Sequence, residues 1–124
     1  MQDEPTPSEL VKAVADFLRN ELTPQIGGHS AFKLRVAINA LDLVTRQLAL
    51  QGGSDATEAA RLSQLLGIDG SLLELNRALA ERIASGEADL ATPGLAEHLW
   101  QTTLAKLAVD QPNYAAYRRE TERK

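Results

Sequence analysis

Cysteine is absent from the 124 residues of this chain, and aromatic side chains are scarce. Without thiols, the chain can form no disulfide, thiolate zinc site, iron–sulfur cluster or cysteine nucleophile of its own. Because only 4% of the residues are aromatic, a core must be built mainly from Leu, Ala, Val and Ile. Side chains of this size suit the packing of helices on helices.

Long apolar runs and extended basic clusters are also missing. No stretch approaches the roughly 18 apolar residues of a membrane span, and the acidic N-terminus is unlike a signal peptide. The net charge is −4 with both signs interspersed, whereas nucleic-acid binding needs clustered Lys and Arg. The basic residues in the tail 118–124 are diluted by Glu120 and Glu122. We therefore expect a soluble cytoplasmic protein that binds neither membranes nor nucleic acid.

What the sequence does contain is a repeated pattern of helix starts and stops. In three places a Thr, Asp or Ser precedes a Glu by three residues, as in the capping box, where each side chain bonds the other's backbone N–H. These boxes begin at Thr6, Asp55 and Ser71, and Thr92-Pro93 is a fourth predicted start. The predicted stops are Gly52, Gly67 and Gly86.

This pattern predicts an all-α fold. We expect one domain, 1–124, forming a bundle of five main helices with flexible ends at 1–7 and 118–124. The helices are predicted over 8–22, 30–51, 55–66, 72–85 and 93–110, with a short additional C-terminal helix over 113–123. No segment between Pro7 and Pro112 has the two-residue alternation of a strand.

The segment 30–51 is apolar around most of its circumference. At about 100° per residue, two apolar seams cover roughly two-thirds of its surface, so we expect this helix at the centre of the bundle. The seams consist of Leu34, Ile38, Leu41, Val44 and Leu48, and of Val36, Ala40, Leu43 and Leu50. The other main helices are expected to bury Leu10, Val14, Phe17 and Leu18; Ala59, Leu62, Leu65 and Leu66; Leu72, Leu75, Leu79 and Ile83; and Ala96, Trp100, Leu104 and Leu107.

Four polar side chains form a strip of about 60° along this apolar helix. They are Arg35, Asn39, Asp42 and Arg46. Such a strip could grip a phosphate or carboxylate group, or a partner helix. The favoured interpretation is structural, with Asp42 and Arg46 paired at i, i+4 on the solvent side.

Asn76 lies on the predicted apolar face of the segment 72–85. A buried amide without partners costs on the order of 1 to 3 kcal/mol, so a polar group must face it. We interpret Asn76 as a polar contact that fixes helix register, the alternative being contact with a ligand or a second subunit. Trp100, the sole tryptophan, is interpreted as a core anchor.

The two histidines, His29 and His98, lack the spacing of a metal site, so we expect no bound metal. His98 shares a helix face with Thr102 and Lys106, and we interpret this face as exposed surface with a Lys106–Asp110 ion pair. The sequence has no nucleophile elbow, Walker loop, dinucleotide fingerprint or paired-carboxylate signature. We therefore expect neither catalytic residues nor a cofactor.

Four segments, Pro5–Leu10, Ala31–Leu41, Leu75–Leu79 and Lys106–Tyr114, carry a family resemblance. They resemble an uncharacterised bacterial domain family of unknown function, whose members accompany aminoglycoside-phosphotransferase-like kinases and acyl-CoA dehydrogenases. The resemblance spans nearly the whole chain and implies an accessory protein in an operon of small-molecule or acyl-CoA metabolism. It assigns no catalytic residue.

Three functional hypotheses follow. The first is a non-catalytic helical module, a homodimer, that binds or regulates a neighbouring kinase-like enzyme or acyl-CoA dehydrogenase. The second is a protein that binds an acyl or phosphorylated small molecule through Arg35, Asn39 and Asn76. The third is an enzyme whose site carries no recognised motif. The candidate contact residues are Arg35, Asn39, Asp42, Arg46, Asn76 and Asp110.

Overall fold

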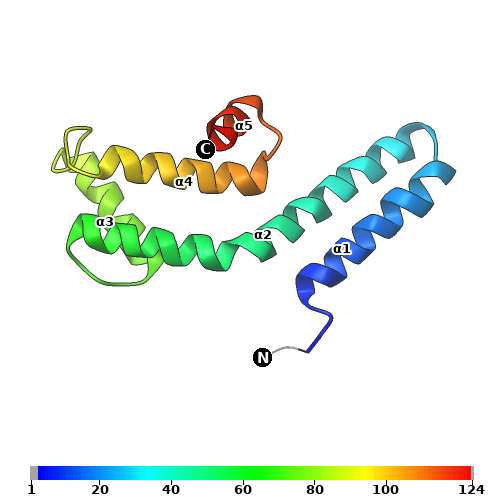
Figure 1. The fold of residues 1–124 in the computed structure, drawn as a ribbon, viewed down its shortest axis with the longest axis horizontal. Helices are drawn as coiled ribbons and strands as arrows, with labels where there is room; N and C mark the ends of the chain where they lie inside the picture. The colour runs from blue at the N-terminus through cyan, green and yellow to red at the C-terminus, as the bar shows by residue number, and fades with distance from the viewer. Residues whose placement is uncertain (1–2, 124) are drawn as a thin grey trace. The chain divides into compact units, whose positions relative to one another are not determined.

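The computed structural model describes residues 3–123, and every regular element in that range is helical. In chain order these are α1 (Pro7–Phe17), a π-helical turn (Leu18–Leu22), a 3-10 turn (Thr23–Gln25), α2 (Gly28–Leu66), α3 (Leu72–Ser85), α4 (Leu95–Asp110) and α5 (Ala115–Glu122) (Figure 1). The all-α prediction is confirmed. Contacts divide the chain into two compact units, Met1–Gln51 and Gly52–Lys124.

Two of the predicted capping boxes form as expected. Thr6 Oγ1 accepts a hydrogen bond from the Glu9 N–H, while the Glu9 carboxylate accepts one from the Thr6 N–H. Ser71 and Glu74 make the same reciprocal pair at the start of α3, with distances of 3.2 and 2.8 Å. The end of α3 is also confirmed, because Gly86 adopts φ +80°, a left-handed conformation that suits glycine.

The third predicted box is wrong, because α2 does not stop at Gly52. The segments 30–51 and 55–66 form a single helix of 39 residues that ends at Leu66, next to the predicted stop Gly67. Glycine in a helix interior costs only about 1 kcal/mol relative to alanine, which the flanking helical residues can offset. A glycine pair is therefore a weaker stop signal than a single glycine held at positive φ.

The predicted start of the fourth long helix is also wrong. Helix α4 begins at Leu95 rather than Pro93, and Gly94 occupies the N-cap position with φ +86°. Thr92 is used elsewhere, since its hydroxyl accepts from the Asp89 N–H at 2.9 Å. The local hydrogen bonds of this turn thus compete with helix capping for the same side chain.

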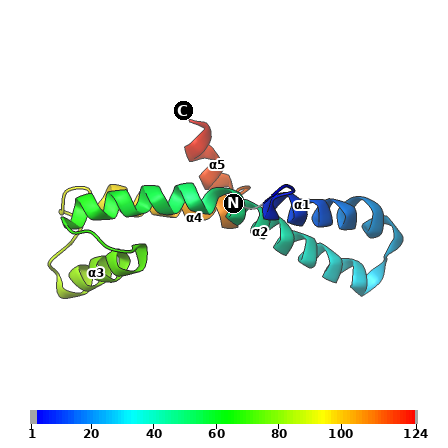
Figure 2. The same cartoon turned by 90° about the horizontal axis from the view of Figure 1, so that it is seen from below.

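Within the unit Met1–Gln51, α1 packs against the first half of α2 as an antiparallel hairpin (Figures 1 and 2). Of the hydrophobic residues described in this unit, only Ala15 and Ile38 are buried. The predicted central position of 30–51, wrapped on several sides, is therefore contradicted by its exposure. The short Ala15 side chain lets the two helix backbones approach closely.

The apolar stripe predicted for the first helix is not buried. Leu10, Val14 and Phe17 are 50%, 51% and 52% exposed, whereas Ala15 is 1% exposed. Neighbouring helical positions lie about 100° apart, so burying Ala15 turns the predicted stripe away from α2. The α1 face that contacts α2 is thus narrower and less apolar than the periodicity indicated.

The unit Gly52–Lys124 contains the larger hydrophobic core. Its buried members come from the end of α2, from α3, from the loop that follows and from the start of α4: Leu62, Leu66, Leu75, Leu79, Ala88 and Leu95. The predictions for Leu62, Leu66, Leu75 and Leu79 are confirmed.

Other core predictions in this unit are wrong. Ile83 is 43% exposed and Trp100 is 47% exposed. Helix α4 instead buries Leu95 and His98, which are three residues apart and share one face. The short helix α5 contacts α4. Among residues 3–123, no helix has both the length and the apolarity needed to span a membrane.

Candidate functional site: the Arg61–His98 cleft

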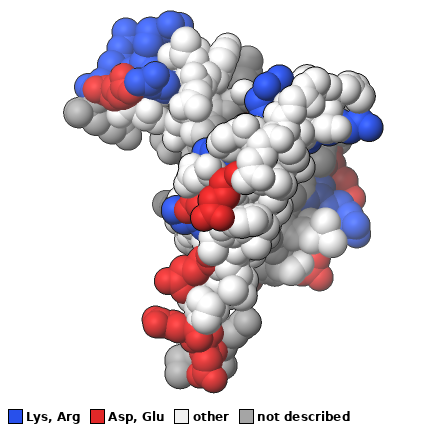
Figure 3. Space-filling view, turned by 90° about the vertical axis from the view of Figure 1, so that its right-hand side faces the viewer, with Lys and Arg blue, Asp and Glu red and all other residues white. Residues whose placement is uncertain are grey.

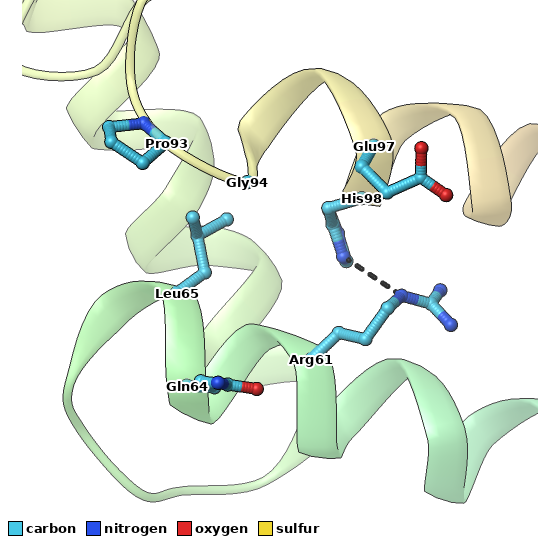
Figure 4. A pocket seen from close by; sticks show the side chains of 7 residues that line it. All are labelled: Arg61, Gln64, Leu65, Pro93, Gly94, Glu97 and His98. Carbon is cyan, nitrogen blue, oxygen red and sulfur yellow. Dashed lines mark hydrogen bonds between the residues drawn. The ribbon is translucent and has the colours of Figure 1, made fainter.

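A cleft of about 400 Å³ lies between the last turns of α2 and the first turn of α4 (Figure 4). Both walls belong to the unit Gly52–Lys124. The lining residues are Arg61, Gln64, Leu65, Pro93, Gly94, Glu97 and His98. This volume falls in the range of roughly 300–1,000 Å³ that small-molecule sites occupy. The site therefore combines room for a ligand with polar and apolar walls.

Arg61 and His98 form the polar centre of the cleft. The Arg61 Nε–H donates to His98 Nδ1 at 3.4 Å, and Arg61 Nη2 donates to Thr102 Oγ1 at 3.4 Å. Both distances are long for hydrogen bonds, so neither contact is strong. Because Nδ1 accepts, a neutral His98 carries its proton on Nε2. His98 is only 3% exposed, which contradicts the predicted exposed surface.

The surroundings of His98 favour its neutral form. Burial lowers the pKa of His98 because the imidazolium loses hydration, and the adjacent Arg61 cation lowers the same pKa further. Glu58 opposes this effect and raises the pKa of His98. The neutral ring can then accept from Arg61 while its Nε2–H remains a donor.

The first turn of α4 adds two backbone donors beside the cleft. Gly94 has no side chain to cap the helix, and the N–H groups of Ala96 and Glu97 have no acceptor in the described part of the chain. The Glu97 carboxylate does not cap them either, because it accepts from Gln101 Nε2 at 2.7 Å. Figure 4 shows this carboxylate turned away from Gln64 and Leu65.

The predicted polar strip on α2 lies in the other unit. Arg35 and Asn39 line a second cleft of about 270 Å³ together with Arg19, Thr23 and Ile38. Both predicted residues are exposed.

Asp42, from the same strip, forms an ion pair with Arg19 of the π-helical turn that follows α1. Its hydrogen bond raises the pKa of the Arg19 guanidinium above the usual value. The partly buried Arg46 lies one turn further along α2. Asp42 thus links α2 to the turn that follows α1.

Asn76 is exposed, contrary to the prediction that it is buried. Its side-chain amide donates to Glu58 Oε1 and to the Leu72 carbonyl, both at 3.1 Å. The contact with Glu58 joins α3 to α2. Asp110 ends α4 in an exposed position, and residues 3–123 contain no Lys106–Asp110 ion pair.

Sequence reasoning missed Arg61, Gln64 and the burial of His98. One signal was available, because His98 lies three residues after Leu95 and Thr102 lies four residues further, on one helix stripe. A buried Leu95 implies that His98 and Thr102 also face the interior of the unit. Arg61 carried no such signal, since a charged residue beside a buried leucine is ordinary on an amphipathic helix.

No group of three or more His, Asp or Glu side chains suited to a metal ion occurs in the range 3–123. Charged side chains of both signs are scattered over the face drawn in Figure 3, with uncharged residues covering much of it.

A family model for a domain of unknown function (DUF6285) matches residues 24–114. The chain belongs to the DUF6285 family. Neither a curated protein nor a solved structure matches it. The DUF6285 match contains the whole Arg61–His98 cleft but begins after α1. The cleft is thus built entirely within the DUF6285 region, whereas Arg19 and Thr23 of the second cleft lie before it.

Proposed function

We propose that this DUF6285 protein is a non-catalytic interaction module that forms a homodimer through the hairpin of α1 and residues 28–51. The observation that carries the proposal is the exposed apolar row on α1. Leu10, Val14 and Phe17 follow the i, i+4, i+7 spacing of one helix face, and each is about half exposed. Contiguous exposed apolar side chains of this kind mark interaction surfaces.

Ion pairs distinguish the opposite side of α1. Lys12 pairs with Asp16 at 2.7 Å, and Asp16 also pairs with Arg19. Arg19 in turn reaches Asp42 on α2. The polar edges of the two helices therefore lie on the same side of the hairpin.

The apolar row of α1 and one part of the exposed apolar surface of α2 share the other side. From the buried position Ile38, Val44 and Leu48 lie roughly 80–120° around α2 in one direction, while Asn39 and Asp42 lie in the other. Val44 and Leu48 are 40% and 47% exposed. Together with the row on α1 they form a two-helix apolar face.

A second copy of the chain is the occupant that we propose for this face. Four charged residues of the polar edge, Lys12, Asp16, Arg19 and Asp42, are ion-paired with one another, so these four do not attract an oppositely charged partner. Two hairpins stacked by their apolar faces give a four-helix bundle, the common solution for amphipathic helices. The added burial would supplement a unit in which Ala15 and Ile38 are the only buried hydrophobic residues described.

The mass in solution tests the dimer. Size-exclusion chromatography with light scattering should give twice the chain mass of 13.4 kDa for the wild type. Val44→Glu places a carboxylate on the apolar face and should give a monomer. The matched control is Asn39→Glu, which adds the same charge to an exposed position on the polar edge and should remain dimeric. A monomeric wild type, or equal effects of the two variants, would contradict the proposal.

The proposal extends to the setting of the protein. We propose that the dimer is the accessory subunit of an aminoglycoside-phosphotransferase-like kinase or an acyl-CoA dehydrogenase that is encoded in the same bacterial operon. The support is the family resemblance together with a sequence that carries no reaction motif. Light scattering of the dimer mixed with the enzyme encoded beside it should show a larger complex. Two unchanged separate species would argue against this role.

A further inference from the structure

The Arg61–His98 cleft contains a cation without an anionic partner. Arg61 is partly buried, and it makes no ion pair with any residue in the described range. Its two weak hydrogen bonds leave most of the five guanidinium N–H groups available. Because removing a charge from water is costly unless it is paired, an anion bound in the cleft would stabilise Arg61.

The neighbouring polar groups can donate to the same anion. The Nε2–H of neutral His98 has no acceptor in the described chain, and no described side-chain nitrogen or oxygen is both fully buried and unpaired. Nε2 therefore keeps contact with solvent although His98 is 3% exposed. The Gln64 amide also lines the cleft, and the free N–H groups of Ala96 and Glu97 lie beside it.

The charge and shape of the lining narrow the class of anion. With His98 neutral, Arg61 is the only cationic lining residue and Glu97 adds a negative charge to the wall, which suits a singly charged ligand better than a polyphosphate. Leu65 and Pro93 provide apolar surface on the same cleft. A Cβ on Gly94 would lie 3.6 Å from Leu65 Cδ1, an ordinary van der Waals distance, so Gly94 borders the same apolar surface.

From these observations we propose that the cleft binds a small organic monocarboxylate with a short aliphatic chain. The carboxylate accepts hydrogen bonds from the Arg61 guanidinium and from His98 Nε2, and the aliphatic chain packs on Leu65 and Pro93. This site uses different residues from the proposed dimer face. Failure of one proposal therefore leaves the other standing.

Butanoate is a suitable probe because it combines one carboxylate with three further carbons. In an NMR titration of the full-length protein, butanoate should shift the backbone amide signals of Gln64, Ala96, Glu97 and His98, with a roughly millimolar dissociation constant typical of so small a ligand. Neutral butanamide and inorganic phosphate should each bind at least about tenfold more weakly, because one lacks the charge and the other the aliphatic chain. Equal binding of either compound would overturn the assignment, as would the absence of localised shifts.

Variants of the lining residues provide the second test. Arg61→Gln should weaken butanoate binding roughly tenfold or more, since it removes a charge-assisted hydrogen bond. The matched control is Arg77→Gln, which removes an exposed cation of α3 outside the cleft and should leave binding unchanged. Gln64→Trp changes an exposed residue, so the fold should persist while the indole fills the cleft and abolishes binding. Unchanged affinity in the folded Arg61→Gln or Gln64→Trp protein would refute the site.

Discussion

At the scale of single residues, His98 is the only buried polar or charged residue in the described part of the chain. It is a buried histidine whose ring accepts a hydrogen bond from an arginine that lacks a carboxylate partner. Protonation would remove the acceptor at Nδ1 and place two cations side by side. Protonation of His98 should therefore lower the stability of the fold more than protonation of an exposed histidine would.

The first prediction concerns the pH dependence of stability. The pKa of His98 is lower in the folded chain than the value of about 6.5 typical of an unfolded chain, so acid favours unfolding. This contribution to stability is fully present above pH of about 6.5 and is lost as the pH falls toward the folded pKa. Urea unfolding at pH 7.5 and at about pH 5 should show a smaller loss of unfolding free energy in His98→Gln than in the wild type.

The other histidine supplies the control for this comparison. His29→Gln changes an exposed residue in the other unit and should keep the wild-type difference between the two pH values. If His98→Gln showed the same acid sensitivity as the wild type, burial of the neutral ring would not be its cause.

At the scale of elements, local signals predicted some helix ends and failed at others. The Ser71 box and Gly86 were sufficient for α3, because both ends are fixed by hydrogen bonds and a left-handed glycine within a few residues. The end of a helix at Gly52 could not be judged locally, since a glycine without positive φ is compatible with helix. Likewise, the pairing of Arg61 with His98 spans 37 residues and lies beyond any local pattern.

Glycine substitutions test the continuity of α2. A Cβ at Gly52 would meet no atom within 4 Å, and its φ is not positive, so Gly52→Ala should stabilise the protein by about 0.5–1 kcal/mol. Gly86→Ala is the matched contrast, because φ +80° strains alanine and should cost about 1 kcal/mol or more. Thermal and urea unfolding measure both changes. A destabilising Gly52→Ala would indicate a helix stop at that position, as the sequence pattern first suggested.

At the scale of the whole molecule, the all-α class was predictable because it depends on the average of many periodic positions. Which apolar residues are buried was not predictable, since Val14 and Ala15 are adjacent apolar residues of α1 and only Ala15 is buried. The candidate site was not predicted for the same reason, because burial could not be assigned residue by residue. Asn76 was predicted to be buried and is exposed, whereas His98 was predicted to be exposed and is buried.

The proposed dimer predicts a concentration-dependent melting temperature. Association that requires the folded hairpin stabilises it by mass action, so the melting temperature should rise with protein concentration. Differential scanning fluorimetry over a hundredfold range of wild-type concentration should show this rise. Val44→Glu should melt at one temperature throughout, while Asn39→Glu should follow the wild type. A flat wild-type profile would count against the dimer.

The glycine pair inside α2 also affects how the protein unfolds. Gly52 and Gly53 coincide with the boundary between the two compact units, so the helix is intrinsically weakest where the units meet along the chain. Local opening at this point would interrupt cooperativity and let the hairpin and the Arg61–His98 unit fray as separate foldons. Amide hydrogens of the two units would then exchange with solvent at different rates, although one unbroken helix runs through both.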